Sequence, residues 1–304
     1  MANEIRFSTL SSTGGRISAV LSALVVEQLY DPTDLRATLT QVPWASWGSD
    51  TMNVTKNAVP GAFAAASSEI SGGASNSAYT TSKFSLQVAR YLRIYQVTDL
   101  FGISGGPIDV QTVAQNLIDG VALTMTDLIT ALFPNIASNV GTSGAALDVD
   151  KVYDGMYTLN LNNVQGQYTC VLKAKQMNQF RSDLRTEAGA IQYVPATAEL
   201  LKSKGPGFQG SWNGVDFYQS DSVTDDSTDF SGAMYGNGFA AYTLAPVSAL
   251  QAAIPASNIL VDAGELLVEL NRDASNGMSQ LIANLYPAVV EAEDLRGVEI
   301  ISGV

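Results

Sequence analysis

The chain has 304 residues, 46% of them hydrophobic, and its 29 acidic and 16 basic side chains give a formal charge of −13. A chain of this length and composition buries a substantial core, so it is not disordered. The acidic balance leaves no basic stripe to neutralise phosphates, which excludes a protein that reads nucleic-acid sequence.

Histidine is absent from the sequence. Because histidine is the usual proton shuttle at neutral pH and the commonest metal ligand, Ser/His/Asp and Cys/His catalysis are excluded. We therefore expect no enzyme and assign no catalytic, cofactor-binding or metal-binding residue. An enzyme that uses carboxylates alone stays open as an alternative, since 29 acids always offer some pair.

A short first helix is expected near the start of the chain. Apolar residues recur at helical spacing over residues 16–29, and Asp31 with Pro32 ends the pattern. This run lacks the small-x-small cleavage site of a signal peptide, so we expect no export. No stretch approaches the ~20 apolar residues that span a bilayer, so we expect a soluble chain.

The next segment predicts a projecting arm. Trp44 and Trp47 lead into a stretch of small and polar residues that extends to Tyr79. In residues 80–97, apolar and polar side chains then alternate as in one long strand, and Arg90 occupies one of the positions where an apolar residue is expected. Fully extended, this strand reaches roughly 60 Å, whereas a compact domain of this length is about 50 Å across. Part of it should therefore project, with a backbone edge that a neighbouring copy can cover.

Two capped helices and a buried strand follow. Asp109 is expected to cap a long helix that lasts until Pro134, and Asp148 caps a second one. The second helix should turn one apolar face inward, formed by Val149, Val152, Tyr153, Met156 and Leu159. The only cysteine, Cys170, lies among β-formers between Tyr168 and Lys173, which predicts a packed core thiol.

The rest of the chain, residues 175–304, mixes helices and strands irregularly. We expect mainly helix over residues 175–204 and a break over 205–210. After them we expect strands at Val215 to Tyr218, Gly232 to Leu244, Leu266 to Leu270 and Val298 to Ile301, and a helix near Gln280 to Tyr286. Without a regular βα alternation, the predicted fold class is α+β.

Two motifs hint at ligands, and in both the plainer interpretation is favoured. Gly205, Gly207 and Gly210 match the GxGxxG spacing, but the expected order is helix, loop, strand, whereas a dinucleotide site needs strand, loop, helix. Four acids crowd the loop 221–229: Asp221, Asp225, Asp226 and Asp229. We expect a solvated loop there and leave a hard cation as the alternative.

Eight acids lie between Asp262 and Glu299, against Arg272 and Arg296. We interpret this segment as a solvated face. The alternative is a surface that meets a basic partner or repels DNA.

The strings at residues 89–102, 168–185, 210–223 and 232–246 together resemble the major capsid (coat) proteins of tailed bacteriophages, the Hong Kong 97 type. ARYLRIYQVTDLFG (residues 89–102) is similar to the exit from their E-loop, and YTCVLKAKQMNQFRSDLR (168–185) to an A-domain strand and helix. GSWNGVDFYQSDSV (210–223) followed by GAMYGNGFAAYTLAP (232–246) is similar to two further A-domain strands. The resemblance depends on the order and spacing of these strings.

The resemblance implies the following division: N-terminal arm (1–40), E-loop hairpin (41–97), P-domain spine helix (98–136), mixed A-domain (137–250) and closing P-domain strands (251–304). It implies a protein that self-assembles through hexamers and pentamers into an icosahedral head around double-stranded DNA. The implied partners are other copies, a separate scaffolding protein, a portal and a decoration protein, with DNA held without sequence-specific contacts and no membrane. The implied location is the virion, after assembly in the host cytoplasm.

Two other functions stay open. An encapsulin-type compartment shell shares this fold and loads an enzyme, and a virion-surface sugar-binding module is suggested by Trp44, Trp47 and Trp212. Some family members cross-link their subunits through Lys, Asn and Glu. Lys56, Lys83 and Glu69 are hairpin residues of suitable type, but the sequence does not identify their partners, so we infer no cross-link.

Overall fold

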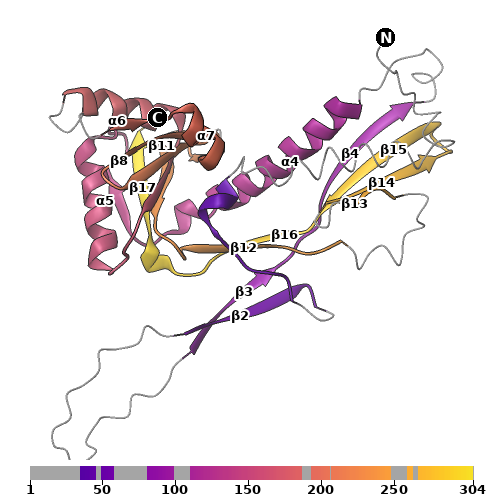
Figure 1. Ribbon diagram of the computed structural model, residues 1–304, viewed down its shortest axis with the longest axis horizontal. Coiled ribbons are helices and arrows are strands. Elements are labelled where there is room, and N and C mark those ends of the chain that lie inside the picture. Colours follow the sequence, from indigo (N-terminus) through magenta and orange to yellow (C-terminus); the bar gives the residue numbers. More distant parts are fainter. Residues whose placement is uncertain are drawn as a thin grey trace, which may run out of the picture.

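In the computed structural model, the described residues are 35–45, 49–57, 81–98, 110–186, 193–205, 207–247, 259–262 and 266–303. The predicted first helix (16–29), Trp47, Glu69 and Asp109 lie outside them. The molecule consists of a compact body around a large sheet, an elongated part built on α4 and a second sheet, and a hairpin that leaves both (Figure 1).

The compact body contains an eight-stranded mixed sheet, in which β5 and β17 pair in parallel, as do β6 and β9. From one edge to the other, its strands are β5 (Asn139–Gly141), β17 (Gly297–Gly303), β11 (Asp229–Tyr235), β6 (Tyr168–Leu172), β9 (Val215–Gln219), β8 (Phe208–Trp212) and β7 (Val194–Pro195), with β10 (Thr224–Asp225) paired to β11.

Alternate side chains of this sheet enter two separate cores, as the period of two in a strand requires. Cys170 and Leu172 pack toward α5 (Val149–Leu161) and α6 (Ala174–Thr186). Val171 points the other way, to a core shared with the end of α4. The thiol of Cys170 is fully buried, which confirms the predicted core position. The short helix α7 (Ala198–Lys204) packs against β8.

The start of α5 is fixed by local chemistry. The Asp148 carboxylate accepts a hydrogen bond from the backbone N–H of Lys151 at 2.8 Å, as the sequence predicted. Two side chains of α6 add to this cap, because Gln179 accepts from the N–H of Leu147 and Asp183 from the N–H of Val149. The first-turn N–H groups of α5 therefore find acceptors in its own cap and in the neighbouring helix.

The elongated part is a four-stranded antiparallel sheet alongside the long helix α4 (Val110–Thr130) (Figure 1). Its strands, in order, are β13 (Ile259–Asp262), β14 (Leu266–Asp273), β15 (Met278–Leu285) and the edge strand β4 (Tyr91–Thr98). On one face, Arg93 of β4 donates to the carbonyl oxygen of Asn116 in α4 at 3.2 Å. That face of the sheet is therefore the one turned toward the helix.

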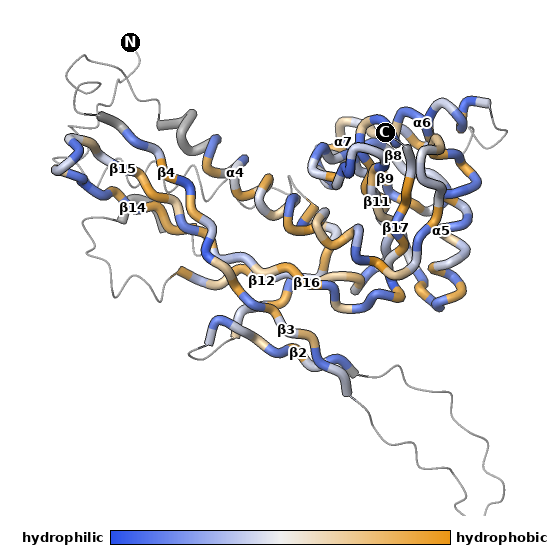
Figure 2. The backbone as a smooth tube through the Cα atoms, turned by 180° about the vertical axis from the view of Figure 1, so that it is seen from behind, coloured by the Kyte–Doolittle hydropathy of each residue, from blue (hydrophilic) through white to orange (hydrophobic). Residues whose placement is uncertain are grey.

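A small three-stranded sheet, β1 (Thr40–Gln41), β12 (Ala240–Leu244) and β16 (Pro287–Glu291), lies between the two parts (Figure 2). The hairpin of β2 (Thr51–Asn57) and β3 (Thr81–Gln87) leaves from it, with β3 against β16. Three 3₁₀ turns complete the described elements: η1 (Leu35–Thr38), η2 (Phe133–Asn135) and η5 (Asp294–Arg296).

The single long strand expected over 80–97 is wrong. β3 and β4 are separate strands in different sheets, and the chain changes sheets at residues 88–90. There the N–H groups of Val88 and Ala89 donate to the carbonyls of Asp50 and Pro287, and Arg90 binds Asn284. The parity break at Arg90 was the signal of this change. The base of the predicted arm is nevertheless present, because the β2–β3 hairpin leaves the body (Figure 1).

The helix expected near Gln280 is also wrong, because this segment is the strand β15. It is hydrogen-bonded on both sides, to β14 and to β4, so tertiary pairing overrides local propensity. The missed signal is the turn before it. Asp273 accepts from the N–H groups of Ser275 and Asn276, and Gly277 has a φ of 60°, which reverses the chain into a hairpin.

Two further boundaries differ from the expectation. The strand expected from Gly232 to Leu244 is β11 and β12 in two sheets, separated by a turn in which Gly238 has a φ of 82°. The long helix ends at Thr130, and η2 contains Pro134. The described part of residues 175–204 contains α6 and α7, with β7 between them in the chain.

We predict that Asp148→Ala lowers the free energy of unfolding by about 1 kcal/mol, because the N–H of Lys151 loses its acceptor. Urea denaturation of unassembled protein measures the change. Asp150→Ala is the matched control, since Asp150 lies in the first turn of the same helix but is not the cap residue. Equal losses for the two variants would contradict a specific role for the cap.

Cys170 should be unreactive in the native protein. Burial raises the pKa of its thiol far above the ordinary value, so almost no thiolate forms at pH 8. A colorimetric thiol reagent should therefore modify no cysteine until guanidinium unfolds the chain. Rapid modification of the native protein would show that the β6 core opens readily.

Candidate assembly surfaces

The glycine motif does not form a nucleotide site. Helix α7 ends at Gly205, whose φ is 88°, and β8 begins at Phe208. The observed order is thus helix, loop, strand, as expected from the sequence, and no helix begins after the motif to present N–H groups to a phosphate.

The acids of the 221–229 loop hold their own turn. Asp226 accepts from the N–H groups of Thr228 and Asp229, and these bonds lower the pKa of its carboxyl. Asp225 accepts from Ser227 and pairs with Lys173 at 3.4 Å, while Asp229 accepts from Gly144. Within the described ranges, no group of three His, Cys, Asp or Glu side chains is arranged to hold a metal ion.

The tryptophans give little support to a sugar-stacking surface. Trp212 is 1% exposed, with its ring between those of Tyr153 and Phe180. Trp44 is half-buried and packs against the base of the β2–β3 hairpin, in the cluster of Met52 and Leu86. Trp212 therefore belongs to the core and cannot stack on a ligand at the surface.

The C-terminal acids are not simply a solvated face. Glu299 is buried, and burial raises the pKa of its carboxyl. Glu269 accepts from Asn284 at 2.7 Å, and Asp294 accepts from the N–H of Ala137 at 3.0 Å. Glu293 forms an ion pair with Lys56. Several of these carboxylates thus bind other parts of the same chain.

The hairpin root is anchored to the body. Met52 of β2 and Leu86 of β3 are buried against Ala288 of β16, and half-buried apolar neighbours surround them: Val42, Trp44, Val54, Phe84, Val88 and Val290. Outside this cluster, Lys56 of β2 forms the ion pair with Glu293 and donates to the carbonyl of Ala292 at 3.3 Å.

Of the three hairpin residues considered for cross-linking, Lys56 is engaged within its own chain and Lys83 is exposed. Glu69 lies outside the described residues.

The edge strand β4 presents apolar side chains to solvent. Leu92 is 51% exposed and Ile94 44% exposed. They are cross-strand partners of Asn284 and Ile282, so they lie on the face of the sheet turned away from α4. A neighbouring copy could bury these side chains and pair with the outer edge of β4, where no other described strand pairs. The sequence correctly grouped Leu92 and Ile94 by parity but did not show that they are exposed.

A polar network crosses the same face next to this edge. Arg90 donates to Oδ1 of Asn284 at 2.9 Å from Nε and at 2.6 Å from Nη2, and Asn284 donates to Glu269. Asn284 is buried, so the network satisfies its amide and holds the entry of the chain into β4.

The outer face of α5 is a second exposed apolar surface. Tyr153, Tyr157 and Leu161 are spaced four residues apart and are 43%, 64% and 67% exposed. Leu295 lies beside the end of this stripe, because its carbonyl accepts from Asn162. Sequence analysis grouped Tyr153 with the apolar face of α5, and its ring does pack against the buried Trp212, although it is also partly exposed. The i, i+4, i+8 repeat of Tyr153, Tyr157 and Leu161 was the signal of a separate outer stripe.

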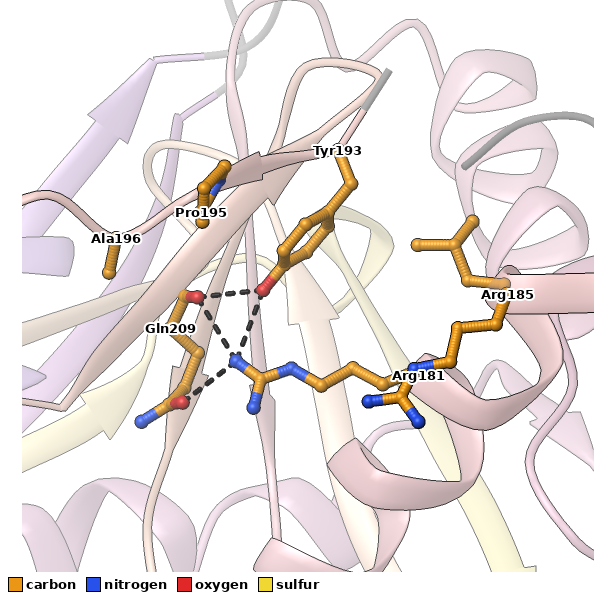
Figure 3. A pocket seen from close by; sticks show the side chains of 7 residues that line it. Arg181, Arg185, Tyr193, Pro195, Ala196 and Gln209 are labelled. Atoms are coloured by element: carbon orange, nitrogen blue, oxygen red, sulfur yellow. Dashed lines mark hydrogen bonds between the residues drawn. The ribbon is translucent and has the colours of Figure 1, made fainter. Parts of the chain in front are cut away.

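A groove of about 460 Å³ lies between α6 and the β7–β8 edge of the large sheet (Figure 3). Its lining residues are Arg181, Leu184, Arg185, Tyr193, Pro195, Ala196 and Gln209. Nη2 of Arg181 donates to the Tyr193 hydroxyl and to both oxygens of Gln209, at 2.9 to 3.1 Å. The Tyr193 hydroxyl also donates to the Gln209 carbonyl at 2.7 Å. Sequence analysis did not single out this groove.

Among the described residues, no helix is long and apolar enough to cross a membrane. No protein-family model matches the sequence, and no curated protein matches it.

Solved structures do match the fold. The chain is similar to a structure of the capsid of Ralstonia phage GP4, with a TM-score of 0.62, 9% identity and coverage of 88% of this chain and 87% of that one. An acid-stable capsid structure of Helicobacter pylori bacteriophage KHP30 matches with a TM-score of 0.60, 9% identity and coverage of 100% and 99%. The holo-SrpI encapsulin complex from Synechococcus elongatus PCC 7942 matches with a TM-score of 0.58, 13% identity and coverage of 88% and 85%. The chain therefore has the α+β phage capsid fold that its sequence led us to expect.

Proposed function

We propose that this chain is the major capsid protein of a tailed bacteriophage, which assembles through hexamers and pentamers into an icosahedral head around double-stranded DNA. The observation that carries the proposal is a hairpin that leaves the body, combined with an apolar strand edge that no other described strand pairs with. The likeness to phage capsid structures over most of the chain supports it.

In this function, the hairpin of each copy lies over a neighbour, and the β4 edge with Leu92 and Ile94 receives apolar and backbone contacts from another copy. Each contact is small, but closed symmetry repeats it in every ring, so weak contacts add up to a stable particle. The anchored root of the hairpin, with Met52 and Leu86 buried, sets the direction in which the arm leaves.

The other parts of the proposal follow from composition and resemblance. The protein is structural, without a catalytic site or cofactor, and a net charge of −13 suits an inner surface that tolerates DNA without binding its sequence. A separate scaffolding protein, a portal and a decoration protein are its proposed partners, and the virion, assembled in the host cytoplasm, is its proposed location. We retain the division at 1–40, 41–97, 98–136, 137–250 and 251–304 as part of the proposal.

An encapsulin-type shell is the second candidate, favoured by the match to the SrpI complex. The contents of purified particles distinguish the two functions. Nuclease-protected double-stranded DNA of defined length supports the phage head, whereas a protein cargo supports the compartment.

The first test is assembly itself. Wild-type protein, expressed with a scaffolding protein from the same source, should form rings and closed shells in negative-stain micrographs. A variant in which an Asn-Gly turn replaces residues 58–80 should fold but stay unassembled. The structure allows this closure because Asn57 and Thr81 are direct cross-strand partners, and Asn-Gly suits a two-residue hairpin. A wild-type chain that stays monomeric would sink the capsid function, and loss of folding in the variant would place residues 58–80 in the core.

The β4 edge can be tested separately. Ile94→Lys adds a charge to an apolar surface that is already exposed, so the urea midpoint of the unassembled protein should change little while shell yield falls severely. Gln96→Lys, which adds the same charge at an exposed polar position of the same strand, is the matched control and should assemble. Normal shells from Ile94→Lys would show that the β4 edge is not buried between copies.

A further inference from the structure

Two surfaces of the compact body are unlike in character. The outer face of α5 carries Tyr153, Tyr157 and Leu161, and the exposed acids Asp150 and Asp154 lie beside the start of this stripe, where Asp154 pairs with Lys151 at 3.3 Å. Tyrosine is enriched at protein interfaces, since its ring contributes a large contact area at a small cost in side-chain entropy. The groove beside α6, in contrast, is cationic.

The cationic groove contains guanidinium N–H groups that can donate hydrogen bonds to a partner. Only Nη2 of Arg181 bonds to Tyr193 and Gln209, so this arginine is held in place while its other donors stay available. Arg185 is exposed and forms no hydrogen bond or ion pair with any described residue. Asp183, the acid between them in α6, is turned to the N–H of Val149 instead. Two guanidinium groups without a carboxylate partner among the described residues suit a carboxylate from another copy.

The two surfaces lie on opposite sides of α6. Gln179 and Asp183 bind the start of α5, whereas Arg181 and Arg185 line the groove. Positions two residues apart are separated by about 200° around a helix. A head-to-tail contact around a ring needs two different surfaces that face apart.

We infer that the groove of one copy binds the outer face of α5 of the next copy in the same ring, with Arg185 against the carboxylate of Asp154 and the tyrosines packed around it. This inference rests on the proposed function, because it assumes ring formation. The charges complement each other, since a groove with two arginines meets a face whose two exposed acids outnumber its one lysine, Lys151, the partner of Asp154 within the chain. A phosphate is a weaker match in a chain with a net charge of −13.

Charge reversal and its rescue test the contact. Arg185→Glu and Asp154→Arg should each raise the subunit concentration needed for half assembly by about tenfold, because each places like charges together. The double variant Arg185→Glu with Asp154→Arg restores opposite charges and should recover most of the wild-type assembly. Light scattering against subunit concentration measures all three variants.

Lys202→Glu on α7 is the matched control, because it makes the same charge change at an exposed site outside the groove. Urea unfolding of each unassembled variant shows whether a loss of assembly is a loss of folding, and Arg185→Ala provides a milder version of the test. Assembly of the single variants at wild-type concentrations, or a double variant no better than the singles, overturns the inference. Normal shells that fail only to retain DNA would indicate a phosphate contact and overturn it too. Failure of the wild-type chain to assemble would instead sink the proposed function, and this inference with it.

Discussion

The change of sheet at residues 88–90 is the constraint on which the architecture depends. Three successive residues are fixed there by partners distant in sequence: Val88 by Asp50, Ala89 by Pro287, and Arg90 by Asn284. These bonds end the hairpin, anchor it to β16 and start β4 at the edge of the second sheet. Without them, the strands on either side would be free to continue as one extended segment, and the hairpin would have no fixed direction.

The same junction explains why part of the fold could be predicted and part could not. The cap at Asp148 and the core position of Cys170 depend on neighbours within a few residues or on a run of β-formers, so the local pattern is enough. The division of residues 80–97 depends on Pro287 and Asn284, which no local pattern includes. β15 fails for the same reason, since both of its partner strands are needed to overrule a helical preference.

The candidate surfaces show a similar limit. The alternation along the predicted strand placed four apolar side chains on one face: Phe84, Leu86, Leu92 and Ile94. In the structure, Leu86 is buried and Ile94 is exposed, because the two residues lie in different sheets. Hydrophobicity alone cannot separate packing within a chain from packing between chains. Acidic residues were likewise taken as solvated, whereas Glu299, Glu269 and Glu293 have specific environments that only the folded chain defines.

The pairing of Asn57 with Thr81 has a consequence for how such a chain can evolve. These two residues are held opposite each other by the stem, so the ends of whatever joins them stay at a fixed separation. The entropy cost of closing a loop rises by only about 0.6 kcal/mol for each doubling of its length. Insertions and deletions between these residues would therefore be tolerated by the subunit fold itself, and selection on that segment would come from the neighbours it has to meet.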